Sequence, residues 1–340
     1  MTLADRFREH FTGEQHLYWH LARGLGDDID AGGPTAQVVA GWEDAPASAV
    51  VQLRLLAGLF REVLTGRADE LRPFYPCLAG SADPAGAWAV ARPVVERAAP
   101  RLRSALEVAP QTNEVGRSVA LLVGISHAVR AAGLHRVRLL EPGASAGLNL
   151  LADRFRFVGD GWSAGPQDSG LVVADVGAEG FVPEAFEVVS RRGCDLAPVD
   201  AATDEGALRL RSFVWPFHLE RHRRLDAALA IARDHPVQVD AGGAADWLAA
   251  QLGSPAGEGA LTVVWQSITA QYWPAEEIAR VTAVIDDARS RMPLTRVAME
   301  APGAGAGKVT DHSADYPVVE VDSVAVARCD FHGPPVTLLA

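Results

Sequence analysis

A glycine-rich segment follows a short apolar run near the middle of the chain, and its residue types suit ligand binding. It reads Glu141-Pro-Gly143-Ala-Ser145-Ala-Gly147-Leu-Asn149. Glycines let a chain reverse tightly and let a ligand approach the backbone without a Cβ in the way. If a helix begins near Gly147, its free N–H groups favour an acceptor-rich ligand. The segment therefore predicts a nucleotide-like ligand at this turn.

The first interpretation of the turn is the opening loop of a Rossmann-like fold that binds S-adenosylmethionine (SAM). That loop usually carries acid-x-Gly-x-Gly-x-Gly after its first strand. Glu141, Gly143 and Gly147 match this pattern, and Ser145 replaces the middle glycine. With Asn149, these residues form the first part of the predicted cofactor site.

The second interpretation is a nucleophile elbow of a serine hydrolase, with Ser145 as the attacking group. It needs an acid and a histidine downstream, for which Asp240 and His312 are candidates. Elbows normally lie deep in a sheet, whereas the sequence before residue 137 is helical and has no His-Gly-Gly run. The SAM interpretation is therefore favoured, and a purely structural turn is the third alternative.

Residues on neighbouring segments extend the predicted cofactor site. Asn113 and Arg117 begin the helix before the first strand, so they lie at the strand's carboxyl end; Arg117 suits a ligand carboxylate. The alternative is a helix cap with a weak Glu114–Arg117 surface pair. Tyr272 and His218 are candidate catalytic groups, although methyl transfer requires alignment more than a strong base.

Three aspartates are candidates for contacts with a nucleoside. Asp195 follows the expected second strand, where an acid often binds ribose hydroxyls; the usual gap of about 20 residues is exceeded, so an inserted hairpin must absorb the excess. Asp175 is the other candidate for this contact with the ribose. Alternatively, either aspartate is only a solvated residue in a turn. Asp240 follows the third strand, where it meets adenine or caps the next helix.

Beyond the turn, the pattern alternates between strand and helix. The expected elements are strand Val137–Leu140, a strand near 188–194, a helix near 204–233, strand Val237–Val239, helix Ala244–Leu252, strand Leu261–Trp265, helix Ala275–Ser290, strand Thr295–Met299, and late strands Val318–Val321, Val324–Ala327 and Val336–Leu339. Alternation of this kind predicts a mostly parallel sheet with helices on both faces, and the late strands predict an antiparallel edge.

Residues 1–110 show helical periodicity without a convincing strand, as in Val50–Leu64, where leucines recur three residues apart. We therefore expect two domains: a helical lid over residues 1–110 and a Rossmann-like α/β domain over 111–340. Short alternating runs predict a β-hairpin inserted near 155–190.

Composition narrows the class of partner. The chain has 340 residues and a net charge of −12, which disfavours nucleic acid. Three scattered cysteines and the His218/His222 pair, without a third ligand, indicate no metal site. Neither a signal peptide nor a membrane span is evident, so we expect a cytoplasmic protein with a small-molecule substrate. The oligomeric state and the substrate stay open.

Several motifs together resemble a bacterial family, the uncharacterised domain-of-unknown-function family 2332. They are Gln111-Thr-Asn-Glu-Val-Gly-Arg117, Glu141–Asn149, Gly193-Cys-Asp-Leu-Ala-Pro-Val-Asp200, Val214-Trp-Pro216, Phe74-Tyr-Pro76 and the closing His332-Gly333. The glycine-rich turn resembles that of class I SAM-dependent methyltransferases. This resemblance implies a seven-stranded sheet with an antiparallel last strand and SAM as cofactor. A methyltransferase acting on a small molecule is thus the leading expectation; a non-catalytic binding or regulatory protein and a serine hydrolase are the alternatives.

Overall fold

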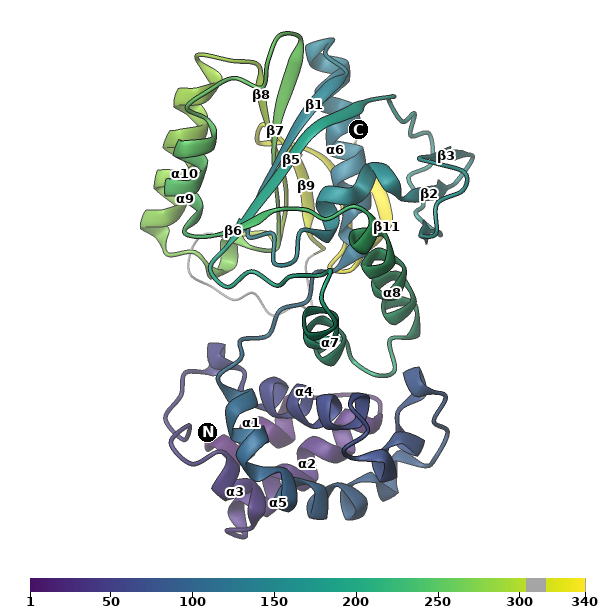
Figure 1. Ribbon diagram of the computed structural model, residues 1–340, viewed down its shortest axis with the longest axis vertical. Coiled ribbons are helices and arrows are strands. Elements are labelled where there is room, and N and C mark those ends of the chain that lie inside the picture. Colours follow the sequence, from purple (N-terminus) through teal and green to yellow (C-terminus); the bar gives the residue numbers. More distant parts are fainter. Residues whose placement is uncertain (304–315, 340) are drawn as a thin grey trace. The chain divides into compact units, whose positions relative to one another are not determined.

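The computed structural model describes residues 1–303 and 316–339. The chain forms two compact units (Figure 1). The helical unit comprises residues 1–112 and 208–222, and the sheet unit comprises residues 113–207 and 223–340.

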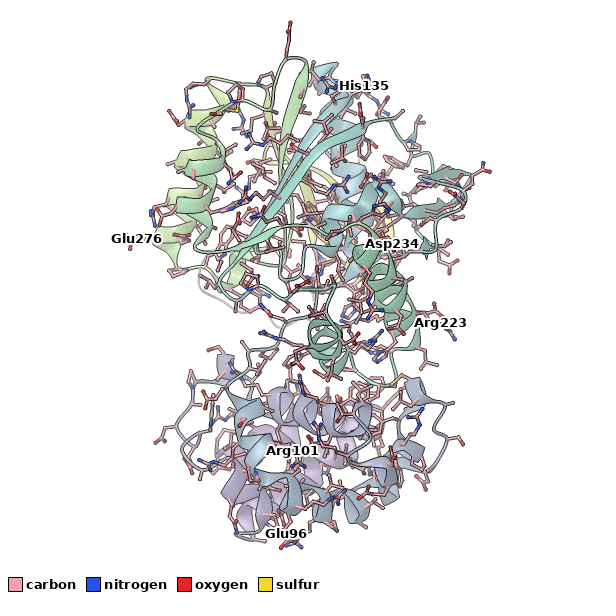
Figure 2. All side chains as sticks on the ribbon, viewed as in Figure 1. Glu96, Arg101, His135, Arg223, Asp234 and Glu276 are labelled. Carbon is pink, nitrogen blue, oxygen red and sulfur yellow. The ribbon has the colours of Figure 1, made fainter. Side chains whose placement is uncertain are left out.

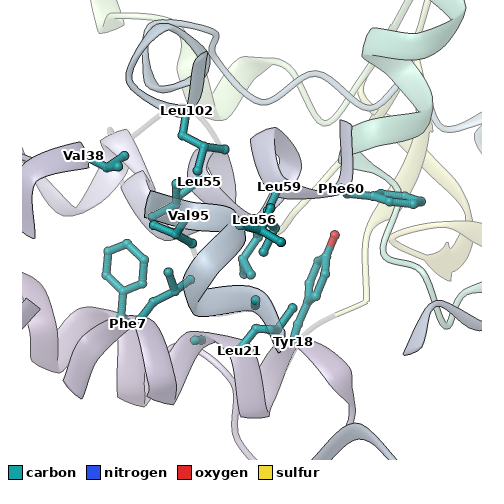
Figure 3. Close-up of a cluster of buried hydrophobic side chains, with 14 of the residues drawn as sticks. Phe7, Tyr18, Leu21, Val38, Leu55, Leu56, Leu59, Phe60, Val95 and Leu102 are labelled. Carbon is teal, nitrogen blue, oxygen red and sulfur yellow. The ribbon is translucent and has the colours of Figure 1, made fainter. Parts of the chain in front are cut away.

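The helical unit confirms the predicted helical N-terminal region. Its helices are α1 (Leu3–Glu9), α2 (Leu17–Asp30), α3 (Pro34–Val38), α4 (Val51–Leu64) and α5 (Ala87–Leu106), joined in part by the 3₁₀ segments η1 (Ala47–Ala49), η2 (Asp69–Phe74), η3 (Pro76–Leu78) and η4 (Pro84–Gly86). Of the leucines that recur three residues apart on α4, Leu56 and Leu59 are buried and pack with Leu21 and Val95 (Figure 3), whereas Leu53 is only partly buried at the edge of this core.

Residues 208–222 join this unit although they come from the sheet-bearing part of the sequence. Aromatic rings hold them: Trp215 meets Phe11 edge-on at 5.2 Å, and Phe217 stacks on His16 at 4.1 Å. The single helix expected near 204–233 is therefore two helices, α7 (Asp204–Phe213) and α8 (Leu219–Asp234). The Trp-Pro sequence between them interrupts the helix, because proline disfavours the helical conformation of the preceding residue.

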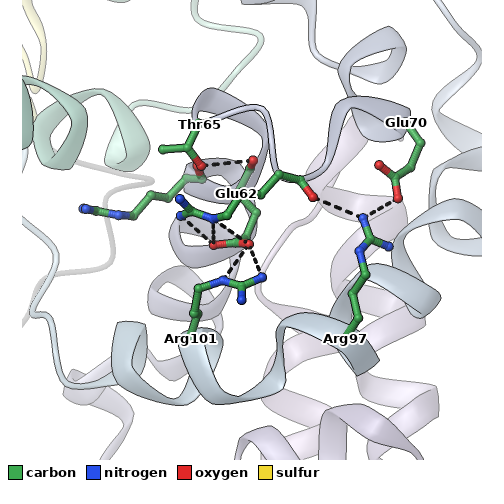
Figure 4. A network of polar contacts seen from close by, with 7 residues as sticks. Glu62, Thr65, Glu70, Arg97 and Arg101 are labelled. Atoms are coloured by element: carbon green, nitrogen blue, oxygen red, sulfur yellow. Dashed lines mark hydrogen bonds and ion pairs between the residues drawn. The ribbon is translucent and has the colours of Figure 1, made fainter.

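A buried carboxylate fixes the packing of α4 and α5. Glu62 accepts hydrogen bonds from Arg67 and Arg101, and a neighbouring pair joins Glu70 to Arg97 (Figure 4). Burial opposes ionisation of Glu62, but the two guanidinium groups outweigh it and lower the pKa of Glu62 below its ordinary value. Figure 2 shows a charged partner of this network, Arg101, on the same unit.

The sheet unit contains an eight-stranded, mostly parallel sheet of order β11-β10-β9-β8-β7-β1-β5-β6. Its strands are β1 (Arg136–Pro142), β5 (Glu187–Asp195), β6 (Val239–Ala241), β7 (Ala260–Ser267), β8 (Leu294–Glu300), β9 (Val318–Val321), β10 (Val324–Asp330) and β11 (Gly333–Leu338). The parallel core and the antiparallel edge are confirmed. The sheet has the eight strands that the sequence pattern predicts, one more than the resemblance to methyltransferases implies, because β9, β10 and β11 form a meander.

Helices cover both faces of this sheet (Figure 1). On one face α6 (Ser118–Ala132) packs against β7 to β11, and on the other α9 (Ala244–Gln251) and α10 (Ala275–Arg289) pack over β5 and β8. The side chain of Leu140 on β1 belongs to the hydrophobic core formed with α9 and α10. In Figure 2, Glu276 lies on the outer side of α10.

The connection from β1 to β5 differs from a simple crossover helix. It contains the 3₁₀ helix η6 (Leu148–Arg154) and a small sheet of β2 (Arg156–Gly159), β3 (Trp162–Ala164) and β4 (Val172–Val173). β2 and β3 form the predicted hairpin, and β4 adds to it in parallel. Among the described residues, no helix is long and apolar enough to cross a membrane.

Candidate functional site

The order of the parallel strands reverses at one place in the sheet, beside β1. After β1 the chain builds β5 and β6 on one side, and it then returns to add β7 and β8 on the other. In open parallel sheets, ligands bind outside the carboxyl ends of the strands where the order reverses. Here that point is the carboxyl end of β1 beside β7, and the glycine-rich turn begins there.

The turn has a left-handed backbone at every second residue. The φ angles are +75° at Gly143, 56° at Ser145 and +72° at Gly147. A Cβ on Gly143 would lie 2.2 Å from Thr269 Oγ1, and one on Gly147 would lie 2.9 Å from Val239 Cγ2. Both glycines are therefore required by backbone conformation and by packing, and Ser145 adopts a conformation that glycine adopts at lower cost.

Five backbone N–H groups of the turn, those of Gly143, Ala144, Ser145, Gly147 and Leu148, are bonded within the protein, contrary to the expectation that they face a ligand. Those of Gly143 and Ala144 donate to the carbonyl of Cys194 at 2.8 and 2.9 Å. The N–H of Ser145 donates to Asp195 Oδ2 at 2.9 Å, and that of Leu148 donates to Asn113 Oδ1 at 2.8 Å.

Two predicted cofactor residues thereby hold the turn in place. Asp195 ends β5 and also accepts from the N–H of Ala197 at 2.9 Å, while Asn113 fixes the start of η6. The expected α-helix after Gly147 is the seven-residue η6, so the helix-terminus argument fails there. Asp175 follows β4 in the small sheet, which leaves Asp195 as the acid at the end of the second parallel strand.

Three polar side chains around the turn are buried, and each has one oxygen atom without a hydrogen-bond partner. Glu141, Ser145 and Asn149 are 2%, 9% and 1% exposed. Their atoms Glu141 Oε2, Ser145 Oγ and Asn149 Oδ1 have no hydrogen-bond partner within residues 1–303 and 316–339. Buried polar groups are nearly always paired, and an unpaired one costs about 1–3 kcal/mol. We call these three side chains the acceptor cluster.

The electrostatic setting of Glu141 is dominated by its burial. Burial raises the pKa of its carboxyl well above the ordinary value, the nearby Trp265 indole opposes the shift, the Asp195 carboxylate adds to it, and Arg117 opposes it. Arg117 itself donates from Nε to the carbonyl of Phe331 at 2.9 Å.

A second buried carboxyl ends β8, and the sequence motifs did not reveal it. Glu300 Oε1 accepts from Gln266 Nε2 at 3.0 Å and from the N–H groups of Thr269 and Ala270 at 3.2 and 3.1 Å. Burial raises the pKa of Glu300, and these donors and Arg117 oppose the shift. Its position directly after an apolar strand, like that of Glu141, is the signal that could have found it.

Other predicted residues have structural roles or lie elsewhere. Asp240 accepts from Arg192, Gln238 and Trp247, and the Arg192 hydrogen bond is the largest cause that lowers its pKa. It does not cap α9, whose N-cap is Gly243.

The candidate catalytic groups lie in different units. His218 belongs to the helical unit, in ring contact with Trp215, whereas Tyr272 is 71% exposed after β7. His312 lies outside the described residues. The described residues contain no group of three or more potential metal ligands.

A cavity of about 400 Å³ borders the other side of the turn. Its lining residues are Ala146, Leu151, Pro198, Val199, Asp200, Ala201, Ala202, Ala232, Pro236, Val237, Gln238 and Val239. Most of the lining side chains are small and apolar. Ala146, which belongs to the glycine-rich turn, is one of them. The volume suits a small organic ligand.

Comparisons with known proteins give a family but no activity. The family model "Uncharacterized protein conserved in bacteria (DUF2332)" matches residues 3–337, which is nearly the whole chain. No curated protein and no solved structure matches the chain.

Proposed function

We propose that this chain, which belongs to that family of uncharacterised bacterial proteins, binds SAM at the carboxyl ends of β1, β5 and β7 and transfers its methyl group to a small molecule. The acceptor cluster carries the proposal: three buried acceptors without donors lie where the strand order reverses. SAM brings an ammonium group, a sulfonium and ribose hydroxyls, so it supplies both the missing donors and positive charge.

The strand order gives independent support. Numbered along the chain, the parallel strands β6-β5-β1-β7-β8 follow the order 3-2-1-4-5 of a Rossmann-like, methyltransferase-type sheet. Glu141 and Asp195 end the first and second of these strands, as the acids of SAM sites do. Ser145 has the left-handed backbone that suits a glycine, as is expected where that motif has glycine.

Side chains, more than backbone N–H groups, make the proposed contacts. Glu141 and Asn149 hold the cationic end of the ligand, and Arg117 faces its carboxylate. Leu196 is 83% exposed directly after Asp195, and with Tyr272 it offers apolar surface to a base. SAM supplies an activated methyl group, and the chain's own contribution is alignment and exclusion of water.

The alternatives are distinguishable. A regulatory protein would bind SAM at the same residues without turnover. For a serine hydrolase, the nominated acid Asp240 is already bonded to Arg192, and no hydrogen bond joins Ser145 Oγ to a base among the described residues. A fluorophosphonate probe that labels Ser145 would favour the hydrolase.

Calorimetric titration with SAM and its demethylated product tests the proposal. We expect both to bind the wild type and to bind Glu141→Gln at least ~10-fold more weakly, because one charged hydrogen bond is lost. Glu276→Gln, on the exposed side of α10, is the matched control and should bind as the wild type does. A wild type that binds neither compound refutes the proposal. Binding without formation of the demethylated product identifies the regulatory alternative.

A further inference from the structure

Two further buried acceptor oxygens, which are not part of the acceptor cluster, lie just after β7 and at the end of β8. Glu300 Oε2 and Gln271 Oε1 have no hydrogen-bond partner in the described chain. Gln271 is 7% exposed and belongs to the 3₁₀ segment η7 (Ala270–Tyr272), whose first residue, Ala270, is bonded to Glu300. Two acceptors on adjoining segments thus need donors that the described residues do not provide.

The orientation of Glu300 is fixed by its other oxygen. Oε1 accepts three hydrogen bonds, two of them from the backbone N–H groups of Thr269 and Ala270. Rotation of the carboxyl group would break all three at once, so Oε2 is held in one direction. A preorganised acceptor of this kind is typical of a binding site.

We propose, on the basis of the proposed function, that Glu300 and Gln271 bind the amino group of the methyl-accepting substrate, which is a small amine. An amine or ammonium nitrogen donates two or three hydrogen bonds and so satisfies both acceptors, whereas a hydroxyl donates one and a carboxylate none. The net charge of −12 also favours cations. The exposed ring of Tyr272 on η7 offers a cation–π contact beside the same segment.

This assignment gives Glu300 a chemical step. An ammonium nitrogen has no lone pair, so it first loses a proton to Glu300 Oε2. The nitrogen lone pair then forms the new N–CH₃ bond while the S–CH₃ bond breaks and its electron pair stays on sulfur. The proton on Glu300 passes to solvent after the product leaves.

Calorimetry with paired probes tests the inference. Ethylamine, 2-phenylethylamine and putrescine are each compared with the alcohol of the same skeleton, in the presence of demethylated SAM. We expect at least one amine to bind ~10-fold more tightly than its alcohol and to lose that preference in Glu300→Gln, whose amide would place a donor against the amine. Binding of demethylated SAM to the variant should stay within about twofold of the wild type, which also shows that the variant is folded.

A second variant guards against a local structural effect of the first. Gln271→Leu removes the other acceptor without touching the three bonds to Glu300, and it should also reduce the preference for the amine. The inference is overturned if no amine is preferred over its alcohol, or if both variants keep the preference. Demethylated SAM that binds without any amine preference would overturn this subsite alone. Amine preference without binding of demethylated SAM would overturn the proposed function alone.

Discussion

The carboxylate of Asp195 accepts a hydrogen bond from the backbone N–H of Ser145, 2.9 Å away and fifty residues earlier in the chain. This bond joins the end of β5 to the glycine-rich turn after β1. It uses the N–H group that a ligand was expected to meet, and for this reason we propose that a ligand contacts the side chains of Glu141, Ser145 and Asn149 instead.

Loss of this bond should loosen the turn. Asp195→Ala removes the acceptor for the N–H groups of Ser145 and Ala197, and we expect the free energy of unfolding to fall by about 1–3 kcal/mol. SAM affinity should fall with it. Asp168→Ala, at the exposed aspartate between β3 and β4, is the control and should change stability by less than about 0.5 kcal/mol. Equal effects of the two substitutions in denaturant unfolding would contradict the role given to Asp195.

Gly143 is expected to tolerate a methyl group poorly. Its φ is +75°, and a Cβ would lie 2.2 Å from Thr269 Oγ1. Gly133 is the matched control, because its φ is +64° and no atom of the described chain lies within 4 Å of the added Cβ. Gly133→Ala should cost about 1 kcal/mol for backbone strain alone, and Gly143→Ala should cost about 2–4 kcal/mol because overpacking adds to it. Thermal unfolding of the two variants measures the difference.

Glu141 should make the sheet unit less stable as the pH rises. Its pKa in the folded chain lies above the ordinary value of 4.5, so between the two values the unfolded chain is ionised while the folded chain is protonated. Its contribution is complete below pH 4.5 and is lost as the pH rises through the folded pKa. Glu141→Gln cannot ionise, so it should exceed the wild type in stability at high pH and match it in acid. Parallel pH profiles of the two proteins would show that this carboxyl is not buried as described.

Glu62 in the helical unit should act in the opposite direction. Its folded pKa lies below the ordinary value of 4.5, because hydrogen bonds from Arg67 and Arg101 outweigh burial. The stability that it contributes is therefore present above pH 4.5 and lost as the pH falls through the folded value. Glu62→Gln should lower the free energy of unfolding by about 2 kcal/mol near neutral pH and by less in acid. Glu96→Gln, on the exposed side of α5, is the control; an effect of Glu62→Gln that does not change with pH would contradict the assignment.

The order of elements was predictable because it depends on local patterns. Apolar runs between turn residues located β1, β7 and β8, and glycine spacing located the turn. Hydrogen bonds between residues far apart in the sequence were not predictable. The residues around Ser145 do not indicate that its N–H group donates to Asp195. The sequence also did not predict that residues 208–222 belong to the helical unit. They pack there because the ring of Trp215 contacts Phe11, about two hundred residues earlier.

The site could be predicted only where a motif marks it. Glu141 lies within a glycine-rich motif, whereas no motif surrounds Glu300. Glu300 is recognised only in the fold, where Gln266 of β7 donates a hydrogen bond to it. Gly147 packs against Val239, so a bulky residue at this position would disturb the fold whether or not a ligand binds there.

The most direct test of the account is proton release on SAM binding, measured by calorimetry in buffers of different ionisation enthalpy across about pH 5 to 7. A cationic ligand beside Glu141 lowers the raised pKa of its carboxyl, so we predict that binding releases a proton from the wild type and that this release is absent in Glu141→Gln. Binding without proton release, or equal release from both proteins, would contradict the placement of the ligand's positive charge at Glu141.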